Sequence, residues 1–484
     1  MPYVVTQSCC SDASCVVACP VNCIHPAPGE PGFAEAEMVY VDPRACVDCG
    51  ACTTACPVGA IKPHTALAES ERPFIALNES YYADFPHADR TPLAPVPPTR
   101  PRDTDGLRVA VVGAGPAGMY TADELLRHAG VRVDVLERLP RPYGLARWGV
   151  APDHPETRQV AGLFAAIEAQ PGFDYLLGVE VGTHVGTDEM AEHYHAVVHA
   201  TGALGERRLG VPGEELPGCC SATDVVQWYN GHPDHRGAFV DLGHDRVVVV
   251  GNGNVALDVA RILTADPDAL ATTDISADAL ATLRGSRVRE VVVLGRRGPA
   301  EAAFTVPELV GLAGLRDVDV LVDTGGEEIV ADTPRTALLA ELAGRAPVPG
   351  RRRIVLRFRT APVRLLGESE VTGVEVVSGG ATELLPAGMV LRAVGHRVLP
   401  VPGLPYDATA GRIPHQQGRV RAGTYLAGWL KRGPHGFIGT NKACAEETVA
   451  ALLDDHARGL LPEPSRTPAQ LRALLRSRQA ALVG

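Results

Sequence analysis

The sequence predicts a multidomain protein in which a small, cysteine-rich α+β unit precedes two Rossmann-like α/β domains. Three observations lead to this fold class. Nine of the 12 cysteines fall between Cys9 and Cys56. Two glycine-rich turns each follow an apolar, β-branched run, and such runs alternate with helical patterns, as in parallel α/β sheets. The length of 484 residues allows about three domains.

Composition excludes several classes of function. A net charge of -12 argues against a nucleic acid or an anionic membrane surface as partner. No run of about 18 apolar residues occurs, so we expect no membrane span. Residues 1–10 lack the basic and apolar regions of a secretory signal, which predicts a cytoplasmic protein. In that reducing compartment, clustered cysteines indicate metal or redox ligands rather than disulfides.

The segment from Cys46 to Pro57 has the spacing C-x2-C-x2-C-x3-C-P, which holds iron–sulfur clusters in bacterial ferredoxins. In such runs three closely spaced thiolates bind one cubane cluster, and the fourth cysteine binds the other cluster. Zinc is the alternative metal, but a zinc site normally closes with two cysteine pairs or with histidines. The spacing therefore favours iron–sulfur clusters.

An earlier segment repeats this spacing, with Asp12 in place of its second cysteine. Crossed pairing then predicts a 4Fe–4S cluster on Cys19, Cys46, Cys49 and Cys52. The second cluster is left with Cys9, Cys15 and Cys56. It is either a 3Fe–4S cluster or a 4Fe–4S cluster with Asp12 as an oxygen ligand, and the sequence leaves both open. Cys10 and Cys23 remain, and we expect them to pack near the clusters.

The cysteine-rich unit is assigned residues 1–70, and a tail and linker follow at 71–105. Residues 74–85 are predicted to pack as a tail on this unit. Residues 91–102 (TPLAPVPPTRPR) are too rich in proline for a helix or a central strand, which predicts a stiff, extended linker. At the other end of the chain, Thr467 as N-cap, Pro468 as first helical residue and Gln470 as capping partner predict a C-terminal surface helix with a structural role.

Strands are predicted at 108–112, 132–136, 196–200, 246–250 and 290–294. The first is followed by a turn that contains Gly113, Gly115, Ala117 and Gly118, and then by a helical run. Glycines at such a turn let the backbone approach a pyrophosphate, which binds at the helix N-terminus. Glu137, 19 residues after Gly118, ends the next strand and suits the hydroxyls of a ribose. Together these features predict a dinucleotide site.

A second turn of this kind, from Gly251 to Ala256, follows the strand at 246–250. The next strand is capped not by an acid but by Arg296 and Arg297, whose guanidinium groups suit the 2′-phosphate of NADP. Salt bridges within the protein are the alternative role for these arginines. Two dinucleotide sites in one chain indicate one redox pair, and we expect FAD and NADPH.

Residues 106–462 resemble the NADPH–ferredoxin reductases of the adrenodoxin reductase type. The motifs that carry the resemblance lie at 142–155 (PYGLARWGVAPDHP), 251–258 (GNGNVALD), 295–299 (GRRGP), 302–308 (AAFTVPE) and 428–439 (GWLKRGPHGFIG). About the first 60 residues resemble seven-iron and eight-iron bacterial ferredoxins, and the whole arrangement resembles the fused ferredoxin–reductase proteins of actinobacteria. The resemblance implies a discontinuous FAD-binding domain, at 106–208 and 393–484, with an NADP-binding domain inserted at 209–392.

By the same resemblance, FAD is lined by Glu137, Leu145, Val181, Trp429, Gly436, Phe437 and Ile438. NADPH is implied to contact Asn252, Gly253, Asn254, Val255, Arg296, Arg297, Glu308 and Gly436. Glu301 stands where the family more often has glutamine, and its carboxylate would repel the NADP phosphate. His154 and Asp258 are implied to form a polar pair that moves protons near the flavin. Alternatively, His154 only fixes the turn at 153–155.

The resemblance implies that hydride passes from NADPH to FAD, and that single electrons then pass to the clusters and to an acceptor protein, either a ferredoxin or a haem monooxygenase. We expect a monomer. A disulfide reductase would need a C-x-x-C pair near the flavin, whereas Cys219 and Cys220 are adjacent and Cys444 is single. Two more functions stay open: an electron-input flavoprotein like the small subunit of glutamate synthase, and an NADPH-responsive redox carrier or sensor.

Overall fold

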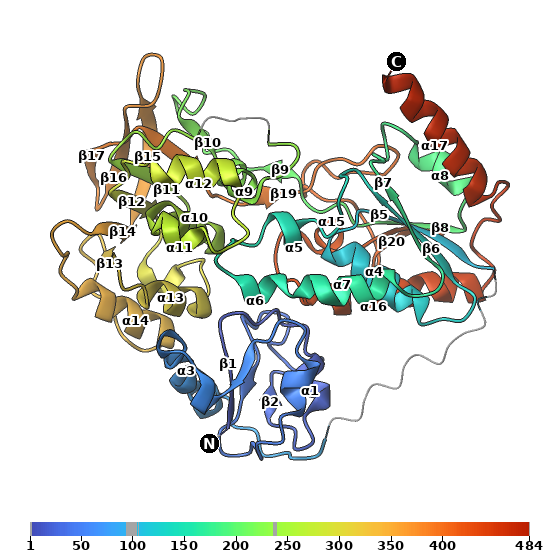
Figure 1. The fold of residues 1–484 in the computed structure, drawn as a ribbon, viewed down its shortest axis with the longest axis horizontal. Helices are drawn as coiled ribbons and strands as arrows, with labels where there is room; N and C mark the ends of the chain where they lie inside the picture. The colour runs from blue at the N-terminus through green and yellow to red at the C-terminus, as the bar shows by residue number, and fades with distance from the viewer. Residues whose placement is uncertain (1, 93–103, 105, 236–239, 484) are drawn as a thin grey trace.

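The computed structural model describes residues 2–92, 104, 106–235 and 240–483. Figure 1 shows an N-terminal unit, in blue, below two larger parts that are each built around a six-stranded sheet. Most of the predicted linker at 91–102 lies outside the described residues. None of the described helices is both long and apolar enough to cross a membrane.

The N-terminal unit, residues 2–92, contains two short antiparallel strand pairs. These are β1 (Tyr3–Val5) with β4 (Ile61–Pro63), and β2 (Ile24–His25) with β3 (Tyr40–Val41). Its α-helices are α1 (Ser14–Ala18), α2 (Ala51–Ala55) and α3 (Pro73–Asp84). Phe74 and Leu77 of α3 are buried, and Oδ1 of Asn78 accepts the N–H groups of Val5 (3.2 Å) and Val41 (2.9 Å). The predicted tail at 74–85 is therefore a helix that packs on this unit.

The first large sheet has the strand order β20-β21-β8-β5-β6-β7, and all of its pairs except β20–β21 are parallel. Its strands are β5 (Arg108–Val112), β6 (Arg132–Glu137), β7 (Phe173–Leu177), β8 (Ala196–His199), β20 (Arg419–Arg421) and β21 (Thr424–Leu426). One face packs against α4 (Pro116–Leu126), α7 (Val160–Glu168) and α16 (Thr440–Ala457). The other face packs against α8 (Thr187–Ala191) and α17 (Pro468–Val483). This sheet is thus assembled from two separate stretches of the chain.

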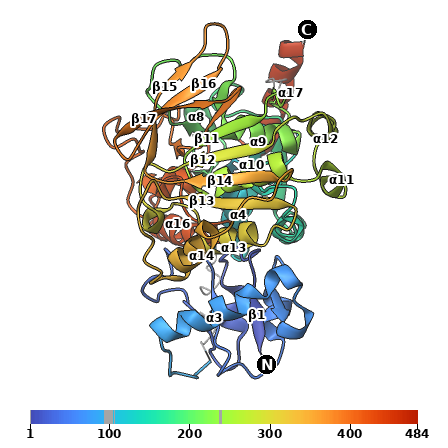
Figure 2. The same ribbon diagram turned by 90° about the vertical axis from the view of Figure 1, so that its left-hand side faces the viewer.

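The second large sheet is parallel throughout, with the order β10-β18-β11-β12-β14-β13. Its strands are β10 (Cys219–Ser221), β11 (Arg246–Val250), β12 (Glu290–Leu294), β13 (Val318–Asp323), β14 (Arg352–Arg357) and β18 (Met389–Arg392). One face carries the helices α9 (Ala222–Asn230), α10 (Asn254–Thr264), α12 (Ala277–Arg284), α13 (Val306–Ala313) and α14 (Pro334–Ala343). The other face carries an antiparallel sheet of β15 (Thr360–Leu366), β16 (Gly373–Ser378) and β17 (Ala381–Pro386), as Figure 2 shows.

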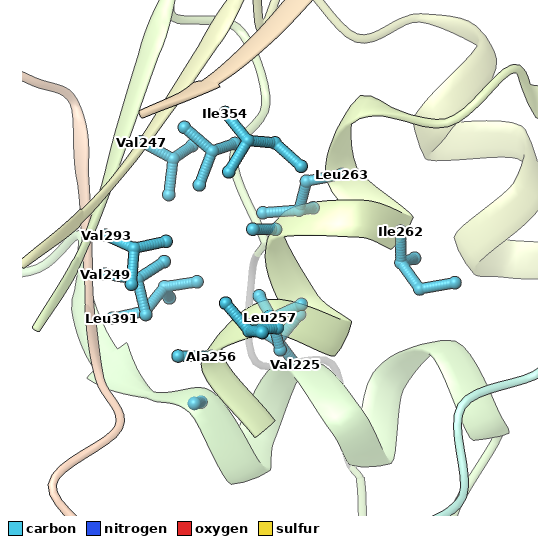
Figure 3. Close-up of a cluster of buried hydrophobic side chains, with 14 of the residues drawn as sticks. Val225, Val247, Val249, Ala256, Leu257, Ile262, Leu263, Val293, Ile354 and Leu391 are labelled. Atoms are coloured by element: carbon cyan, nitrogen blue, oxygen red, sulfur yellow. The ribbon is translucent and has the colours of Figure 1, made fainter. Parts of the chain in front are cut away.

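Figure 3 shows how the second sheet fixes α10. Val249 and Val293 of the sheet face Leu257 of the helix, and all three side chains are buried. Burying a side chain of this size stabilises the fold by about 1.5–3 kcal/mol. Because one face of α10 is held in this core, the position of its first turn, which follows Gly253, is also fixed.

The chain crosses between the two large sheets twice, and β9 (Gly205–Glu206) pairs with β19 (His396–Arg397) at the crossing. The other short α-helices are α5 (Leu145–Trp148), α6 (Pro155–Arg158), α11 (Pro267–Leu270) and α15 (Trp429–Arg432), and the 3-10 helices are η1 (His64–Ala66), η2 (Glu69–Glu71) and η3 (Pro299–Glu301). Three predicted strands coincide with β5, β11 and β12; β6 is one residue longer than predicted and β8 one residue shorter. The predicted C-terminal helix is α17, and its N-cap Thr467 donates its N–H to Gln470 Oε1 (2.8 Å). Its buried Leu471 and Leu475 pack on the first sheet.

Candidate functional site

The first glycine-rich turn joins β5 to α4 and leaves the start of that helix open. Gly113 has φ of +104°, and a Cβ there would lie 2.7 Å from the carbonyl oxygen of Ala200, so only glycine fits. Glu137 accepts the N–H of Ala114 at 2.9 Å, which holds its carboxylate beside the turn. A Cβ on Gly115 would come no closer than 4.0 Å to its nearest neighbour, and α4 has no side-chain cap. These features fit the pyrophosphate and ribose of a dinucleotide.

The other residues predicted to line FAD lie in three places. Leu145 begins α5 and is 50% exposed. Gly428, the residue before Trp429, packs against Ala117 of α4. This contact places the segment at 428–439 beside α4. In that segment Phe437 donates its N–H to Thr440 Oγ1 (2.9 Å), and residues 436–438 lead into α16. Val181 packs instead in the apolar cluster on the α8 and α17 face of the first sheet.

The second glycine-rich turn joins β11 to α10 in the same way. Gly251 has φ of +111°, a conformation that favours glycine, and Gly253 is the N-cap of α10. Asn254 Oδ1 accepts the N–H of Thr305 (2.8 Å), and Asn254 Nδ2 donates to Thr305 Oγ1 (3.2 Å). Thr305 is also the N-cap of α13, so this pair ties the starts of α10 and α13 together.

Three more residues predicted to contact NADP follow the carboxyl ends of β11 and β12, and Val255 lies in the first turn of α10. Asn252 lies against Gly295, and Val255 is 41% exposed. Arg296 and Arg297 are both exposed at the end of β12, where a phosphate could reach them. Arg297 lies 3.9 Å from Glu301, so part of its charge is already balanced within the protein.

A cluster of charged side chains connects the turn at 153–155 with α10 and α13. Nε2 of His154 is 3.3 Å from Asp258 Oδ1, so the predicted polar pair is present. Arg261, one turn after Asp258 on α10, donates to Asp258 (2.7 Å) and to Asp153 (2.5 and 3.1 Å). Glu308 of α13 completes the cluster, with Oε2 at 3.8 Å from His154 Nε2 and 3.6 Å from Arg261 Nη1.

The charges in this cluster shift one another's pKa values. Although burial opposes it, the hydrogen bond to Asp258 raises the pKa of His154 above its ordinary value. Burial also opposes the shift of Asp258, yet Arg261 and His154 lower its pKa. Burial and the nearby Asp258 raise the pKa of Glu308. The arrangement can therefore hold or exchange a proton on His154 or Glu308, while Arg261 offsets part of the negative charge of Asp153 and Asp258.

Four of the predicted cluster ligands, Cys19, Cys46, Cys49 and Cys52, line one cavity in the N-terminal unit, together with Cys23. Cys19 Sγ and Cys23 Sγ are 3.4 Å apart. Hydrogen bonding with Cys23 lowers the pKa of Cys19 to about 5 and that of Cys46 to about 6. Thiolates are the form that binds iron, so this donor set fits a cubane cluster, and Cys23 supports two of its ligands.

The second predicted ligand group also comes together. Cys9 and Cys15 each interact electrostatically with Cys56 and with the carboxylate of Asp12, and Cys15 also interacts with Cys9. Burial raises the pKa of Cys9 to about 11 and that of Cys15 well above its ordinary value. Metal binding deprotonates such thiols, so three cysteines gathered in this way fit a cluster. Both carboxylate oxygens of Asp12 accept from Ser14, one from its N–H (3.1 Å) and one from its hydroxyl (2.6 Å).

The Cys9 group lies against the segment predicted to approach the flavin. Gly439 donates its N–H to the carbonyl oxygen of Cys10 (2.8 Å), and Lys442 donates to Ser14 Oγ (3.0 Å). Cys10 is buried in the apolar cluster of the first sheet. The backbone of Asp12 packs directly on the α-carbon of Gly439, where a Cβ would lie 2.6 Å from Asp12 Cβ and still nearer to its backbone. Cys49, in the other ligand group, is exposed.

Sequence reasoning missed two residues that act on these sites. The one-turn spacing of Asp258 and Arg261 on a helix could have indicated their pairing, but the contacts of Arg261 with Asp153 and His154 span more than 100 residues. Cys23 was expected only to pack, and it lines the cavity and contacts Cys19. No local pattern marks the contacts of Arg261 with Asp153 and His154.

Comparisons with known proteins agree with this arrangement. The family described as pyridine nucleotide-disulphide oxidoreductase matches residues 107–272, and the 4Fe-4S binding domain matches residues 39–62. A Mycobacterium tuberculosis protein named probable ferredoxin/ferredoxin–NADP reductase is 51% identical over 514 residues, which cover 100% of this chain and 89% of that protein. The mitochondrial NADPH:adrenodoxin oxidoreductase of Arabidopsis thaliana is 38% identical, covering 78% of this chain and 88% of the relative. Among solved structures, Mycobacterium tuberculosis FprA in complex with NADPH has 40% identity and a TM-score of 0.73, covering 78% of this chain and 91% of that one.

Proposed function

Because this chain belongs to the family of fused ferredoxin/ferredoxin–NADP reductases, we propose that it oxidises NADPH and delivers single electrons through its N-terminal unit to an acceptor protein. Bound FAD would supply the conversion of a hydride electron pair into single electrons, and iron–sulfur clusters on the two cysteine groups would carry these electrons onward. The observation that carries the proposal is the contact of Gly439 with Cys10 and Asp12, which joins the flavin segment to a cluster ligand group.

The residues of the two large sheets have positioning roles in this proposal. The open start of α4 and Glu137 bind the FAD pyrophosphate and ribose, and the segment at 436–438 approaches the flavin ring. The start of α10, with Arg296 and Arg297, binds NADPH, and Glu308 holds its nicotinamide end. His154 and Asp258 hold a proton near the flavin. Side chains here orient the two nucleotides and exclude water rather than forming covalent bonds.

The two ligand groups then differ in position and in cluster type. The Cys9 group lies against the flavin segment, whereas the other group includes the exposed Cys49, so electrons leave by way of the second group. Because this group offers three thiols, the cluster type in this proposal is 3Fe–4S, and Ser14 holds the Asp12 carboxylate beside it. A ferredoxin or a haem monooxygenase is the class of acceptor, and a reducing cytoplasm keeps the ligand thiols available.

An anaerobic titration with NADPH, and separately with NADH, tests this function. We expect NADPH to bleach the flavin absorbance and to change the cluster signals in low-temperature electron paramagnetic resonance of the same sample. The oxidised protein is expected to show the signal of a 3Fe–4S cluster before any reductant is added. A flavin that NADPH reduces while the clusters stay unchanged would contradict electron delivery through the N-terminal unit.

Gly439→Ala is expected to slow electron transfer from the flavin to the clusters by about 100-fold. The backbone of Gly439, with φ of -70°, accepts alanine, but the new Cβ would overlap Asp12 and force the N-terminal unit away. The rate of cluster reduction after mixing with NADPH measures the effect. FAD content and ferricyanide reduction should remain normal.

Gly162→Ala is the matched control, because Gly162 lies on α7 and a Cβ there meets nothing within 4 Å. If both variants reduce their clusters at the wild-type rate, the contact at Gly439 is not the route of electron transfer.

A further inference from the structure

We propose that Gln7, a residue of the N-terminal unit, is a positioning residue for Glu308 in the NADPH site. Nε2 of Gln7 donates a hydrogen bond to Glu308 Oε2 at 2.9 Å, although 301 residues separate the two in sequence. The same carboxylate oxygen is 3.6 Å from Arg261 and 3.8 Å from His154. Gln7 is therefore the closest of these three polar neighbours, and it comes from a different part of the protein.

Helix α13 leaves space for this side chain at Gly311. Gly311 lies on α13, three residues after Glu308 and so on the same face of the helix. A Cβ at Gly311 would lie 2.6 Å from Gln7 Nε2 and 2.7 Å from its Cδ. The lack of a side chain at this position lets the Gln7 amide reach Glu308.

The backbone next to Gln7 is fixed within the N-terminal unit. Thr6 donates its N–H to the carbonyl oxygen of Ala60 (2.8 Å), and Cys9 donates to the carbonyl oxygen of Thr6 (3.2 Å). A single turn of the chain thus carries both Gln7, which contacts Glu308, and Cys9, which belongs to the ligand group with Cys15 and Cys56. The position of Gln7 is set by the same hydrogen bonds that set the position of this ligand.

A second residue of the N-terminal unit holds the helix that carries Glu308. Glu37 Oε2 accepts the N–H of Val306 (2.7 Å), in the first turn of α13, and its Oε1 accepts from Arg335 of α14 (2.6 Å). A carboxylate at this end of a helix also interacts favourably with the helix dipole. The N-terminal unit therefore fixes both α13 and the carboxylate that α13 presents.

Glu308 needs such support because its surroundings disfavour its charge. On α10 it faces the carboxylate of Asp258 and the guanidinium of Arg261, and on the turn at 153–155 it faces His154. Burial and Asp258 raise the pKa of Glu308, whereas the hydrogen bond from Gln7 lowers it. Gln7 thus favours the ionised carboxylate in one orientation. This inference rests on the proposed function, in which Glu308 contacts NADPH.

Gln7→Leu and Gly311→Ala test the inference from opposite sides of the contact. In anaerobic stopped-flow experiments, both variants are expected to bind NADPH about tenfold more weakly, with the limiting rate of flavin reduction within about twofold of wild type. Loss of the donor raises the pKa of Glu308 further. The dissociation constant for NADPH is measured across a range of pH. The pH halfway through its change is expected to be higher in both variants than in the wild type, because Glu308 stays neutral to a higher pH.

Glu69→Ala is the matched control. Glu69 pairs with Arg316 across the same two parts of the protein, but both side chains are more than 70% exposed. Such a pair contributes little to stability, and neither residue touches Glu308, so NADPH binding and its pH midpoint should not change.

Three results would overturn the inference, and they have different meanings. If Gln7→Leu and Gly311→Ala match the control in both quantities, Gln7 does not position Glu308. If all three variants weaken NADPH binding equally, docking of the whole N-terminal unit is responsible rather than Gln7. If NADPH fails to reduce the flavin of the wild-type protein, the proposed function fails and this inference fails with it.

Discussion

Replacing both Arg296 and Arg297 by alanine is expected to raise the KM for NADPH by about 100- to 1,000-fold. The two guanidinium groups are exposed at the carboxyl end of β12, beside the open start of α10, where the 2′-phosphate of NADPH would lie. Hydrogen bonds to a charged group contribute about 1.5–3 kcal/mol each, and solvent exposure favours the lower end of that range. Steady-state ferricyanide reduction with NADPH measures the change.

NADH serves as the internal control for the double variant, because it lacks the 2′-phosphate. Its KM is expected to stay within about threefold of the wild-type value. Arg345→Ala provides a matched surface variant, since Arg345 pairs with Glu341 on its own helix end and with a carbonyl oxygen, away from the nucleotide sites. Equal losses with NADPH and NADH in the double variant would mean that the arginines support the fold rather than recognise the phosphate.

Cys19→Ala is expected to remove the 4Fe–4S cluster and to lower electron delivery to an acceptor protein by about 100-fold or more. Cys19 lines the cavity that also contains Cys46, Cys49 and Cys52, although in sequence it follows Cys15. Flavin reduction by NADPH should be unaffected, because the residues of the nucleotide sites are unchanged. Iron content is expected to fall by about four atoms per chain.

Cys56→Ala is the reciprocal variant, because Cys9 and Cys15 both interact electrostatically with Cys56. It is expected to remove the 3Fe–4S signal of the oxidised protein and to retain the signal of the reduced 4Fe–4S cluster. If each variant instead loses the cluster of its sequence neighbours, the crossed pairing of ligands is wrong.

The sequence predicted the two nucleotide-binding folds well because their signals are local. A buried parallel strand is a continuous apolar run, so β5, β11 and β12 were found at their observed bounds. Each glycine-rich turn directly follows its strand, and Gly113 and Gly251 have the positive φ angles that the turns require. The C-terminal helix was marked by its own capping residues, Thr467 and Gln470.

The contacts between the parts of the protein could not be predicted in this way. Gln7 and Glu308 are 301 residues apart, and neither has a spacing that points to the other. The close approach of Asp12 to Gly439 depends on how two separately packed cores fit together. Hydrophobic periodicity determines which face of an element is buried, but not which surface of one domain meets which surface of another.

The contact of Gly439 with Cys10 and Asp12 also determines how a separate ferredoxin can compete for electrons. To approach the segment at 436–438, a free carrier would have to displace a unit that belongs to the same polypeptide. Covalent attachment keeps such a unit at an effective concentration of about 1 mM, so a carrier at micromolar concentration is outcompeted about a thousandfold at equal affinity. A free carrier is left with the exposed side of Cys49. Gene fusion would thereby select acceptors by their fit to that outer surface, and not by their access to the flavin.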